Sequence, residues 1–221
     1  TLKGEKTMKK ILVFGGTRFF GKALVQRLIH KGYEVTIATR GQARDDFGSS
    51  VNRIVVDREN KESLMQAIGN KYFDVVVDNI CYSPDDAKIA IEVLADKVGK
   101  YVVTSSMAVY EHEGTPLMEE DFDSFQCRVV DGSRQDFSYG EGKQLAEAFF
   151  FQQANFPVVA VRFPVVLGKE DYSKRLYFYC ERIINKQPLH VREGELSFVL
   201  DLEAARFLEW CCENDYSGPI N

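Results

Sequence analysis

Residues 9–38 constrain the fold more than any other part of this sequence. Residues 11–14 form an unbroken apolar run, which is typical of a strand buried on both faces of a parallel sheet. A glycine turn follows, and residues 22–31 then carry apolar side chains at helical spacing before the pattern stops at Gly32. Residues 34–38 predict the next strand. The stretch therefore predicts a βαβ unit whose helix directs its N-terminus at the turn, where backbone N–H groups and the helix dipole favour a phosphate.

Segments of the same two kinds continue along the chain. Strands are predicted at residues 53–56, 74–77, 100–104 and 157–162, and helices at residues 63–68, 84–96 and 139–153. Alternating strands and helices indicate an α/β fold with a doubly wound parallel sheet, and right-handed crossovers give the strand order 3-2-1-4-5-6. Ligands bind such sheets at the carboxyl ends of the strands. The acidic residues 111–135 lack periodicity and predict a long surface loop.

The pattern changes after Gly168, so two parts are expected. Residues 8–168 are predicted to form the nucleotide-binding domain, and residues 169–221 a partial substrate-binding lobe over the cleft. This small C-terminal lobe is predicted to contain two helices and short strands, at residues 176–184, 202–213 and 189–199. Residues 1–7 are interpreted as an N-terminal extension outside the fold.

Composition argues against several classes of protein. The 221 residues carry a formal net charge of −5, which counts against nucleic-acid binding through bulk basicity. No apolar run reaches the roughly 18 residues of a membrane span, and the start has no signal-peptide core. The five cysteines include no CxxC pair and no zinc-like spacing, so a reduced, metal-free, cytoplasmic protein is expected. The adjacent Cys211 and Cys212 suit a redox pair, but packing on a helix face is the simpler interpretation.

Five short motifs, each weak alone, are specific in their order and placement. They are Gly15-Gly-Thr-Arg-Phe-Phe-Gly21, Ser105-Ser-Met-Ala-Val-Tyr110, Tyr139-Gly-Glu-Gly-Lys143, Arg162-Phe-Pro164 and Ser197-Phe-Val199. With these motifs the chain resembles the extended or atypical short-chain dehydrogenase/reductase superfamily, in its NAD(P)-dependent epimerase/dehydratase branch, from Met8 to about Glu213. The resemblance implies a Rossmann fold, a dinucleotide cofactor and chemistry at a hydroxyl or keto carbon.

Tyr139 and Lys143 are the candidate catalytic residues, together with Ser106. Side chains four residues apart on a helix share one face. A free tyrosine is a poor base at neutral pH, but a nearby ammonium favours the phenolate. Ser106, at the end of a predicted strand, can donate to or accept from the same substrate oxygen. The resemblance implies hydride transfer with a nicotinamide while Tyr139 moves the proton; the alternative is an ordinary Tyr–Lys pair on an exposed helix.

The glycine turn departs from the family pattern, because Arg18 replaces the middle glycine that lets the backbone approach the pyrophosphate. An arginine there can cap the phosphates by charge-assisted hydrogen bonds, or it can extend into solvent. After the second strand, where NAD sites usually carry an acidic residue, the chain has Thr39 and Arg40. A cation suits a 2′-phosphate, so NADP is slightly preferred over NAD, unless Arg40 is a solvated loop residue.

The resemblance also assigns cofactor contacts to the glycine turn and strand ends, and substrate contacts to the tail. Cofactor contacts are expected at Gly15, Gly16, Thr17, Arg18, Phe19, Phe20, Gly21, Thr39, Arg40, Asp57, Arg58, Asn79, Ile80, Cys81, Thr104, Pro164, Val165 and Val166. Contacts to a substrate diphosphate are expected from Arg175, Arg182 and Arg192, each of which is also typical of a solvated surface charge. Met107 and Ala108 occupy the place where family dehydratases carry an acid/base pair, so dehydration is not expected.

An NAD(P)-dependent epimerase or oxidoreductase is therefore expected, acting on a small molecule, with a nucleotide sugar as the candidate substrate. The alternative is a cofactor-binding regulatory or RNA-binding module of the atypical branch, because proteins with a similar Gly-Gly-Thr-Arg-Phe turn resemble chloroplast RNA-binding factors. The acidic balance counts against nucleic acid. In relatives the helices corresponding to residues 85–96 and 139–153 often pair across a dimer, so the resemblance also implies a homodimer, although core packing explains the aromatic residues 149–151 equally well.

Overall fold

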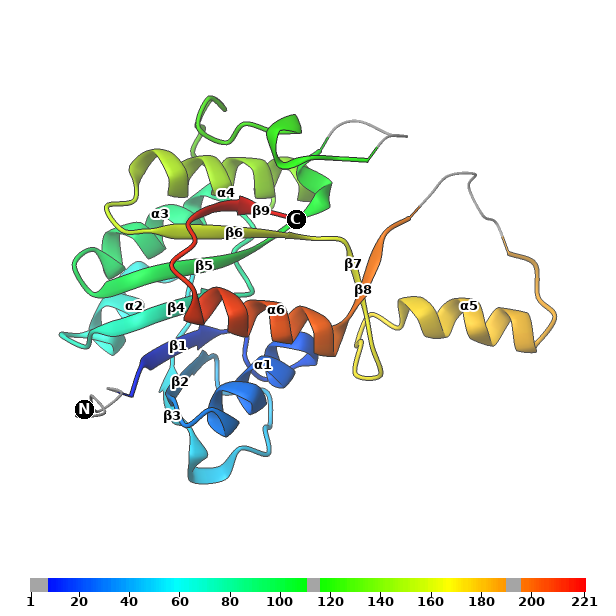
Figure 1. Ribbon diagram of the computed structural model, residues 1–221, viewed down its shortest axis with the longest axis horizontal. Helices are drawn as coiled ribbons and strands as arrows, with labels where there is room; N and C mark the ends of the chain where they lie inside the picture. The colour runs from blue at the N-terminus through cyan, green and yellow to red at the C-terminus, as the bar shows by residue number, and fades with distance from the viewer. Residues whose placement is uncertain (1–7, 111–115, 190–195) are drawn as a thin grey trace, which may run out of the picture.

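A parallel sheet runs through the centre of the molecule, with helices on both of its faces (Figure 1). The computed structural model describes residues 8–110, 116–189 and 196–221. Within these residues the main sheet has seven strands, in the order β3-β2-β1-β4-β5-β6-β9. They are β1 (Lys10–Phe14), β2 (Glu34–Thr39), β3 (Asn52–Val55), β4 (Phe73–Asp78), β5 (Val98–Ser106), β6 (Val158–Phe163) and β9 (Gly218–Ile220). The predicted doubly wound sheet is confirmed, and β9 adds a parallel strand beside β6.

The side chains of β1 show how the two faces of the sheet are covered. Ile11 and Val13 pack on one face with α1 (Phe19–His30) and α6 (Asp201–Glu213). Leu12 and Phe14 pack on the other face with the helices α2 (Lys61–Ile68), α3 (Pro84–Leu94) and α4 (Tyr139–Gln153). Successive side chains of a strand point to opposite faces, so a strand covered on both sides has to be apolar throughout.

The start of α4 is fixed by a capping box. The Ser138 hydroxyl accepts a hydrogen bond from the Glu141 N–H, and the Glu141 carboxylate accepts one from the Ser138 N–H. These bonds satisfy backbone donors that a helix N-terminus otherwise leaves open. Tyr139 is therefore the first residue of the helix, directly after its cap.

Helices α3 and α4 pack against each other on one face of the sheet. Phe149 and Phe150 are buried there and Phe151 is half-buried. This packing lies within one chain, so the homodimer stays a prediction. Among the described residues, no helix combines the length and the apolar character needed to cross a membrane.

A second, smaller unit lies beside the main sheet. The strands β7 (Val165–Leu167) and β8 (Phe198–Leu200) form a two-stranded parallel pair, and α5 (Arg175–Ile184) extends away from the body beyond them (Figure 1). Helix α6 and strand β9, in contrast, pack on the main fold. Part of the expected lobe at residues 169–221 is therefore continuous with the sheet, and its role in substrate binding stays a prediction. The expected N-terminal extension, residues 1–7, lies outside the described residues, as do residues 111–115 and 190–195.

Candidate active site

The glycine turn joins β1 to α1 in a compact loop. Gly15 has φ +71°, a left-handed conformation that favours glycine. A Cβ at Gly21 would lie 2.1 Å from the Gly15 carbonyl oxygen, so the helix can begin against the turn only without a side chain there. Arg18, at the N-cap, makes no side-chain capping bond, and the first turn of α1 contains no acidic residue. The helix therefore presents open N–H donors, which suit an anion.

The residue after β4 provides an independent indication of a ligand at this turn. The amide Nδ2 of Asn79 is buried and makes no hydrogen bond within the described residues, while its Oδ1 accepts one from the Thr104 hydroxyl at 2.8 Å. A Cβ at Gly21 would lie 3.2 Å from that Nδ2 atom, so the amide borders the glycine turn. Buried donors normally have a partner. An unpaired donor beside an open helix N-terminus fits an acceptor-rich group such as the pyrophosphate of a dinucleotide.

The other residues of the turn take part in aromatic packing. Phe19 is buried with φ +50°, and its ring lies 6.4 Å from that of Tyr172. Phe20 packs edge-on against Phe163 at 6.0 Å. The exposed Arg18 guanidinium lies 6.0 Å from the Tyr172 ring. Arg18 therefore reaches toward the segment after β7, and its contact with phosphate stays a prediction, as do those of Gly16 and Thr17.

The ends of β2 and β3 differ in how their cations are placed. Arg40 is exposed and forms no ion pair within the described residues, while Thr39 accepts a hydrogen bond from the Gly41 N–H. Arg58, in contrast, is buried and forms ion pairs with two carboxylates. These are Asp78 and Asp86, the latter at 2.7 Å. The Arg58 guanidinium is thus engaged inside the fold, whereas Asp57 is exposed; adenine contacts by either residue stay predictions.

Lys143 lies close to Tyr139, the candidate catalytic tyrosine. Its buried ammonium donates hydrogen bonds to the carbonyls of Cys81 and Thr104, each at 2.7 Å. The same ammonium lies 5.8 Å from the centre of the Tyr139 ring, which is 52% exposed. Ser106, the last residue of β5, accepts a hydrogen bond from the Ala108 N–H at 3.2 Å, and its O–H donates to no acceptor among the described residues. The structure thus brings Tyr139 and Lys143 together at the carboxyl ends of the strands.

Two glycines allow α4 to approach those strand ends. A Cβ at Gly140 would lie 2.5 Å from the Ala108 carbonyl oxygen, and one at Gly142 would lie 2.4 Å from the Tyr82 carbonyl oxygen. Both approaches are too close for a side chain, so any other residue would push the helix away. The first turn of α4 therefore packs directly on the backbone that follows β4 and β5.

Two residues that were not predicted from the sequence lie beside this pair. The Tyr82 ring lies 4.7 Å from the Lys143 ammonium and 6.5 Å from the Tyr139 ring. Burial raises the pKa of Tyr82 to about 12, so it stays a neutral phenol. The Arg134 guanidinium lies 4.3 Å from the centre of the Tyr82 ring. Tyr82 directly follows the segment expected to meet the cofactor, which was an available signal, whereas Arg134 lies in a stretch without periodicity.

The remaining predicted residues lie at the strand ends or in the projecting unit. The Ile80 N–H donates to Asp78, and Val165 and Val166 lie in β7 directly after Pro164. Arg175 bonds Asp171, Ser173 and the Val166 carbonyl, and Arg182 bonds the Pro188 carbonyl. Both arginines are thus engaged locally. Arg192 lies outside the described residues, and substrate contacts by all three stay predictions.

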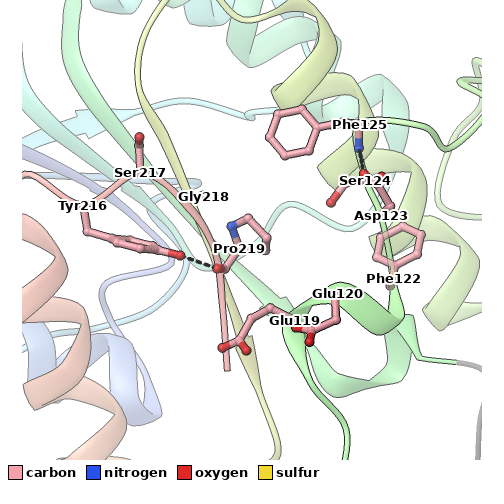
Figure 2. Close-up of a pocket in the computed structure, with 10 residues that line it drawn as sticks. All are labelled: Glu119, Glu120, Phe122, Asp123, Ser124, Phe125, Tyr216, Ser217, Gly218 and Pro219. Atoms are coloured by element: carbon pink, nitrogen blue, oxygen red, sulfur yellow. Dashed lines mark hydrogen bonds between the residues drawn. The ribbon is translucent and has the colours of Figure 1, made fainter.

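A cavity of about 610 Å³ opens elsewhere, beside β9 (Figure 2). It is lined by Glu119, Glu120, Phe122, Asp123, Ser124, Phe125, Tyr216, Ser217, Gly218 and Pro219. None of the predicted site residues lies among them. The Tyr216 hydroxyl donates to the Pro219 carbonyl at 2.6 Å, so part of the lining is occupied with its own chain (Figure 2).

Sequence comparison identifies the part of the chain that contains the glycine turn. Residues 11–96 match the model of the NAD dependent epimerase/dehydratase family. The matched residues include the glycine turn and helices α1 to α3. The expected resemblance to the epimerase/dehydratase branch is thereby confirmed.

Two curated proteins share sequence with the chain. One is the chloroplast stem-loop binding protein of 41 kDa b of Arabidopsis thaliana, 32% identical over 127 residues, or 51% of this chain and 33% of that protein. The other is 2'-dehydrokanamycin reductase of Streptomyces kanamyceticus, 25% identical over 117 residues, or 53% of this chain and 33% of that protein. The aligned region thus spans a third of each of these relatives.

A solved structure shares the fold of the chain. The structure of the Bordetella bronchiseptica enzyme WbmG in complex with NAD and UDP superimposes with a TM-score of 0.78, over 100% of this chain and 74% of that one. The identity is 15%, so this likeness establishes the architecture alone.

Proposed function

We propose that this chain binds NAD or NADP across the carboxyl ends of β1 to β5 and acts as an epimerase or oxidoreductase at a hydroxyl or keto carbon. The observation that carries the proposal is the buried Lys143 ammonium, held by two strand-end carbonyls 5.8 Å from the Tyr139 ring. A cation fixed beside a phenol favours its ionised form and so prepares it for proton transfer. The open N-terminus of α1 and the unpaired Asn79 amide supply the matching anion site.

Each residue of the site has a separate task in this proposal. Tyr139 gives a proton to the substrate oxygen or takes one from it. Lys143 stabilises the phenolate form of Tyr139, and Ser106 donates its free O–H to the same substrate oxygen. A bound nicotinamide supplies the hydride acceptor or donor. Met107 and Ala108, which follow Ser106, cannot transfer protons, so loss of water is not part of the proposed reaction.

A nucleotide sugar is the proposed substrate class. The family match includes the glycine turn, and the structurally similar WbmG is known in complex with NAD and UDP.

The exposed Arg40 at the end of β2 favours NADP in our proposal, because a cation there would meet a 2′-phosphate. Substituting Arg40 with Ala should then weaken NADPH binding by about tenfold and leave NADH binding unchanged.

Tyr139→Phe tests the proposed chemistry. Removing the hydroxyl should lower turnover of a nucleotide-sugar substrate by at least roughly a hundredfold, because general acid–base catalysis contributes 10²–10⁴-fold. The affinity for NADH or NADPH, measured by fluorescence titration, should stay within about twofold. Tyr179→Phe removes an exposed hydroxyl from α5 and serves as the matched control. Equal turnover in the two variants would contradict the proposal.

A second candidate function follows from the 32% identity with the stem-loop binding protein. At α5 the Lys174 ammonium lies 5.7 Å from the Tyr177 ring and the Arg182 guanidinium 5.3 Å from the Phe178 ring, and the aromatic residues 177–179 are exposed. Cations next to exposed rings suit an unpaired nucleic-acid strand, because bases stack on aromatic side chains. A titration with an RNA stem-loop at 20 mM salt decides the matter: binding that weakens steeply with salt supports this function, and no binding at this low ionic strength rejects it.

A further inference from the structure

The turn that carries Arg134 is anchored to a distant helix. The Gly132 N–H donates to the Asp85 carboxylate and the Asp85 N–H donates to the Gly132 carbonyl, both at 3.1 Å. An ion pair of 2.8 Å between Lys88 and Asp131 adds to this connection. Two hydrogen bonds and an ion pair thus connect the turn to α3, although 47 positions separate Asp85 from Gly132. Its conformation is set by these contacts and not by the loop sequence alone.

The turn is also closed internally. The Asp136 carboxylate accepts hydrogen bonds from the Ser133 N–H at 2.8 Å and from the Ser133 hydroxyl at 2.7 Å. These bonds lower the pKa of Asp136, so it remains a carboxylate at neutral pH. Glu141, the next acidic residue along the chain, is likewise held by Ser138 in the capping box. Asp131, which lies three residues before Arg134, is paired with Lys88. The nearby carboxylates on both sides of Arg134 in the sequence therefore have partners other than Arg134.

Arg134 itself is exposed and forms no ion pair within the described part of the chain. Its guanidinium lies 4.3 Å from the centre of the Tyr82 ring, a distance typical of a cation–π contact. Such a contact engages the face of the guanidinium and leaves its N–H donors, which lie in the plane, available to a ligand. The contact also restricts the side chain, so less freedom is lost when those donors bind an anion.

Tyr82 connects this cation to the candidate catalytic pair. Its ring lies 6.5 Å from the ring of Tyr139 and 4.7 Å from the Lys143 ammonium. Lys143 is buried and already bonded to two carbonyls, whereas Arg134 is exposed. Of the two cations around Tyr82, Arg134 is therefore the one that can reach a substrate.

We propose that Arg134 binds an anionic group of the substrate, a carboxylate or a phosphate, next to the carbon on which Tyr139 acts. The guanidinium fork matches the two oxygens of such a group. Tyr82 holds the fork in place, so it is a positioning residue, and Arg134 determines specificity for a charged substrate. This inference rests on the proposed function, because it places the anion beside the proposed acid/base.

Calorimetric titrations of the full chain, with and without NAD, test the subsite. The probes are UDP-glucuronate, UDP-glucose and UDP. If the anion is a ring carboxylate, Arg134→Gln raises the Kd of UDP-glucuronate by about tenfold and leaves UDP-glucose unchanged, as expected for the loss of a charge-assisted hydrogen-bond pair. If it is the diphosphate, the Kd of all three probes rises alike. Either result supports the proposal.

Three further results keep the proposal falsifiable. Arg128→Gln removes an exposed arginine from the same loop and should leave every Kd unchanged. Tyr82→Leu should reproduce part of the loss, whereas Arg134→Lys, which keeps the charge without the fork, should fall between the wild type and Arg134→Gln. Unchanged Kd values in Arg134→Gln would overturn the subsite, and so would a wild type that binds none of the probes.

The subsite and the proposed function fail in different ways. Arg134→Gln should bind NADH as the wild type does, since no described contact links it to the glycine turn; a loss of NADH binding would place Arg134 in the cofactor site and overturn the inference. Failure of the proposed function would appear instead as equal turnover in Tyr139→Phe and Tyr179→Phe.

Discussion

Helices α4 and α5 both contain three successive aromatic residues, yet they lie in opposite environments. In α4, residues 149–151 pack against α3 and the sheet, and the Phe150 side chain is 1% exposed. In α5, residues 177–179 are all exposed, and the Phe178 side chain is 49% exposed. None of the residues of α5 is buried against the described parts of the chain, and the helix extends away from the body (Figure 1).

The difference shows that burial follows from the position of an element and not from its composition. Helix α4 connects two neighbouring strands of the sheet, β5 and β6, so the crossover places it on a face that is already apolar. Helix α5 connects β7 to β8, a pair of three-residue strands that offers little surface to cover. The same contrast applies to charged side chains: Glu147 of α4 is buried, and Glu181 of α5 is exposed.

Glu147→Leu should have the largest effect on stability. The Glu147 carboxylate pairs with the fully buried Arg162 at 2.9 Å and accepts hydrogen bonds from Ser105 and Ser124. Removing it leaves a buried guanidinium without its counter-charge, so the free energy of unfolding should fall by about 4 kcal/mol in urea titrations. The matched change Glu181→Leu in α5 should cost less than about 0.5 kcal/mol.

The double variant Glu147→Leu/Arg162→Met sharpens the same comparison. Removing both charges should recover much of the lost stability, because an apolar pair avoids the desolvation cost. A Glu147→Leu variant as stable as Glu181→Leu would mean that the two helices do not differ in the way the structure indicates.

Phe150→Ala should have the next largest effect. Its ring packs 4.6 Å from that of Tyr101, and the site is enclosed by the sheet, so truncation leaves a cavity. The expected loss of unfolding free energy is about 3 kcal/mol. Phe178→Ala in α5, where no enclosed cavity forms, should change it by less than about 0.5 kcal/mol, and equal losses in both variants would indicate that α5 is covered in solution.

Gly142→Ala should have an intermediate effect. Its new Cβ would lie 2.4 Å from the Tyr82 carbonyl oxygen, so the backbone must move. We expect a loss of roughly 2 kcal/mol in unfolding free energy. Turnover should fall by a larger fraction than the unfolding free energy does, because Tyr139 and Lys143 shift with the helix. Gln153→Ala, at the exposed end of α4, serves as the control and should change neither quantity.

The order of the sheet could be predicted from the sequence because it depends on local patterns. The apolar run before Gly15 and the amphipathic helix after it specify a βαβ unit, and handedness then fixes the strand order. The bounds of α4 also follow from local features, since Ser138 and Glu141 form a capping box. The strand β9 was missed because Gly218 and Pro219 are poor strand formers that pair only at a sheet edge.

The candidate site could be predicted only in part, for a related reason. Tyr139 and Lys143 are one helical turn apart, so their spacing is visible in the sequence. Arg134 reaches Tyr82 only through the bonds that tie its turn to α3, and no sequence pattern shows bonds between distant segments. Arg58 appears in the sequence as a strand-end cation, but the carboxylates that hold it inside, Asp78 and Asp86, lie 20 and more positions away.

The cysteines test the contrast between the sheet with its packed helices and the exposed helix α5, with the smallest expected change in stability. Burial raises the pKa of Cys211 to about 12, and it raises that of Cys81 and Cys212 as well. The thiolate is the reactive form, so a raised pKa keeps these three thiols protonated and unreactive from pH 7 to pH 9. Cys180 lies exposed on α5. An alkylating reagent should therefore modify Cys180 and leave the three buried thiols unmodified, as measured by mass spectrometry.

Alkylation of Cys180 should change the unfolding free energy by less than about 0.5 kcal/mol, because none of the residues of α5 is buried. In denaturant the three buried cysteines should react as the chain unfolds. The raised pKa values of these thiols in the folded state also give the sign of a pH effect. Unfolding releases their protons above about pH 8.5, so their titration leaves the unfolding free energy unchanged below that pH and lowers it above that pH. Protection of Cys180 in the native protein would show that α5 is covered in solution, and the two aromatic helices would then differ less than the structure indicates.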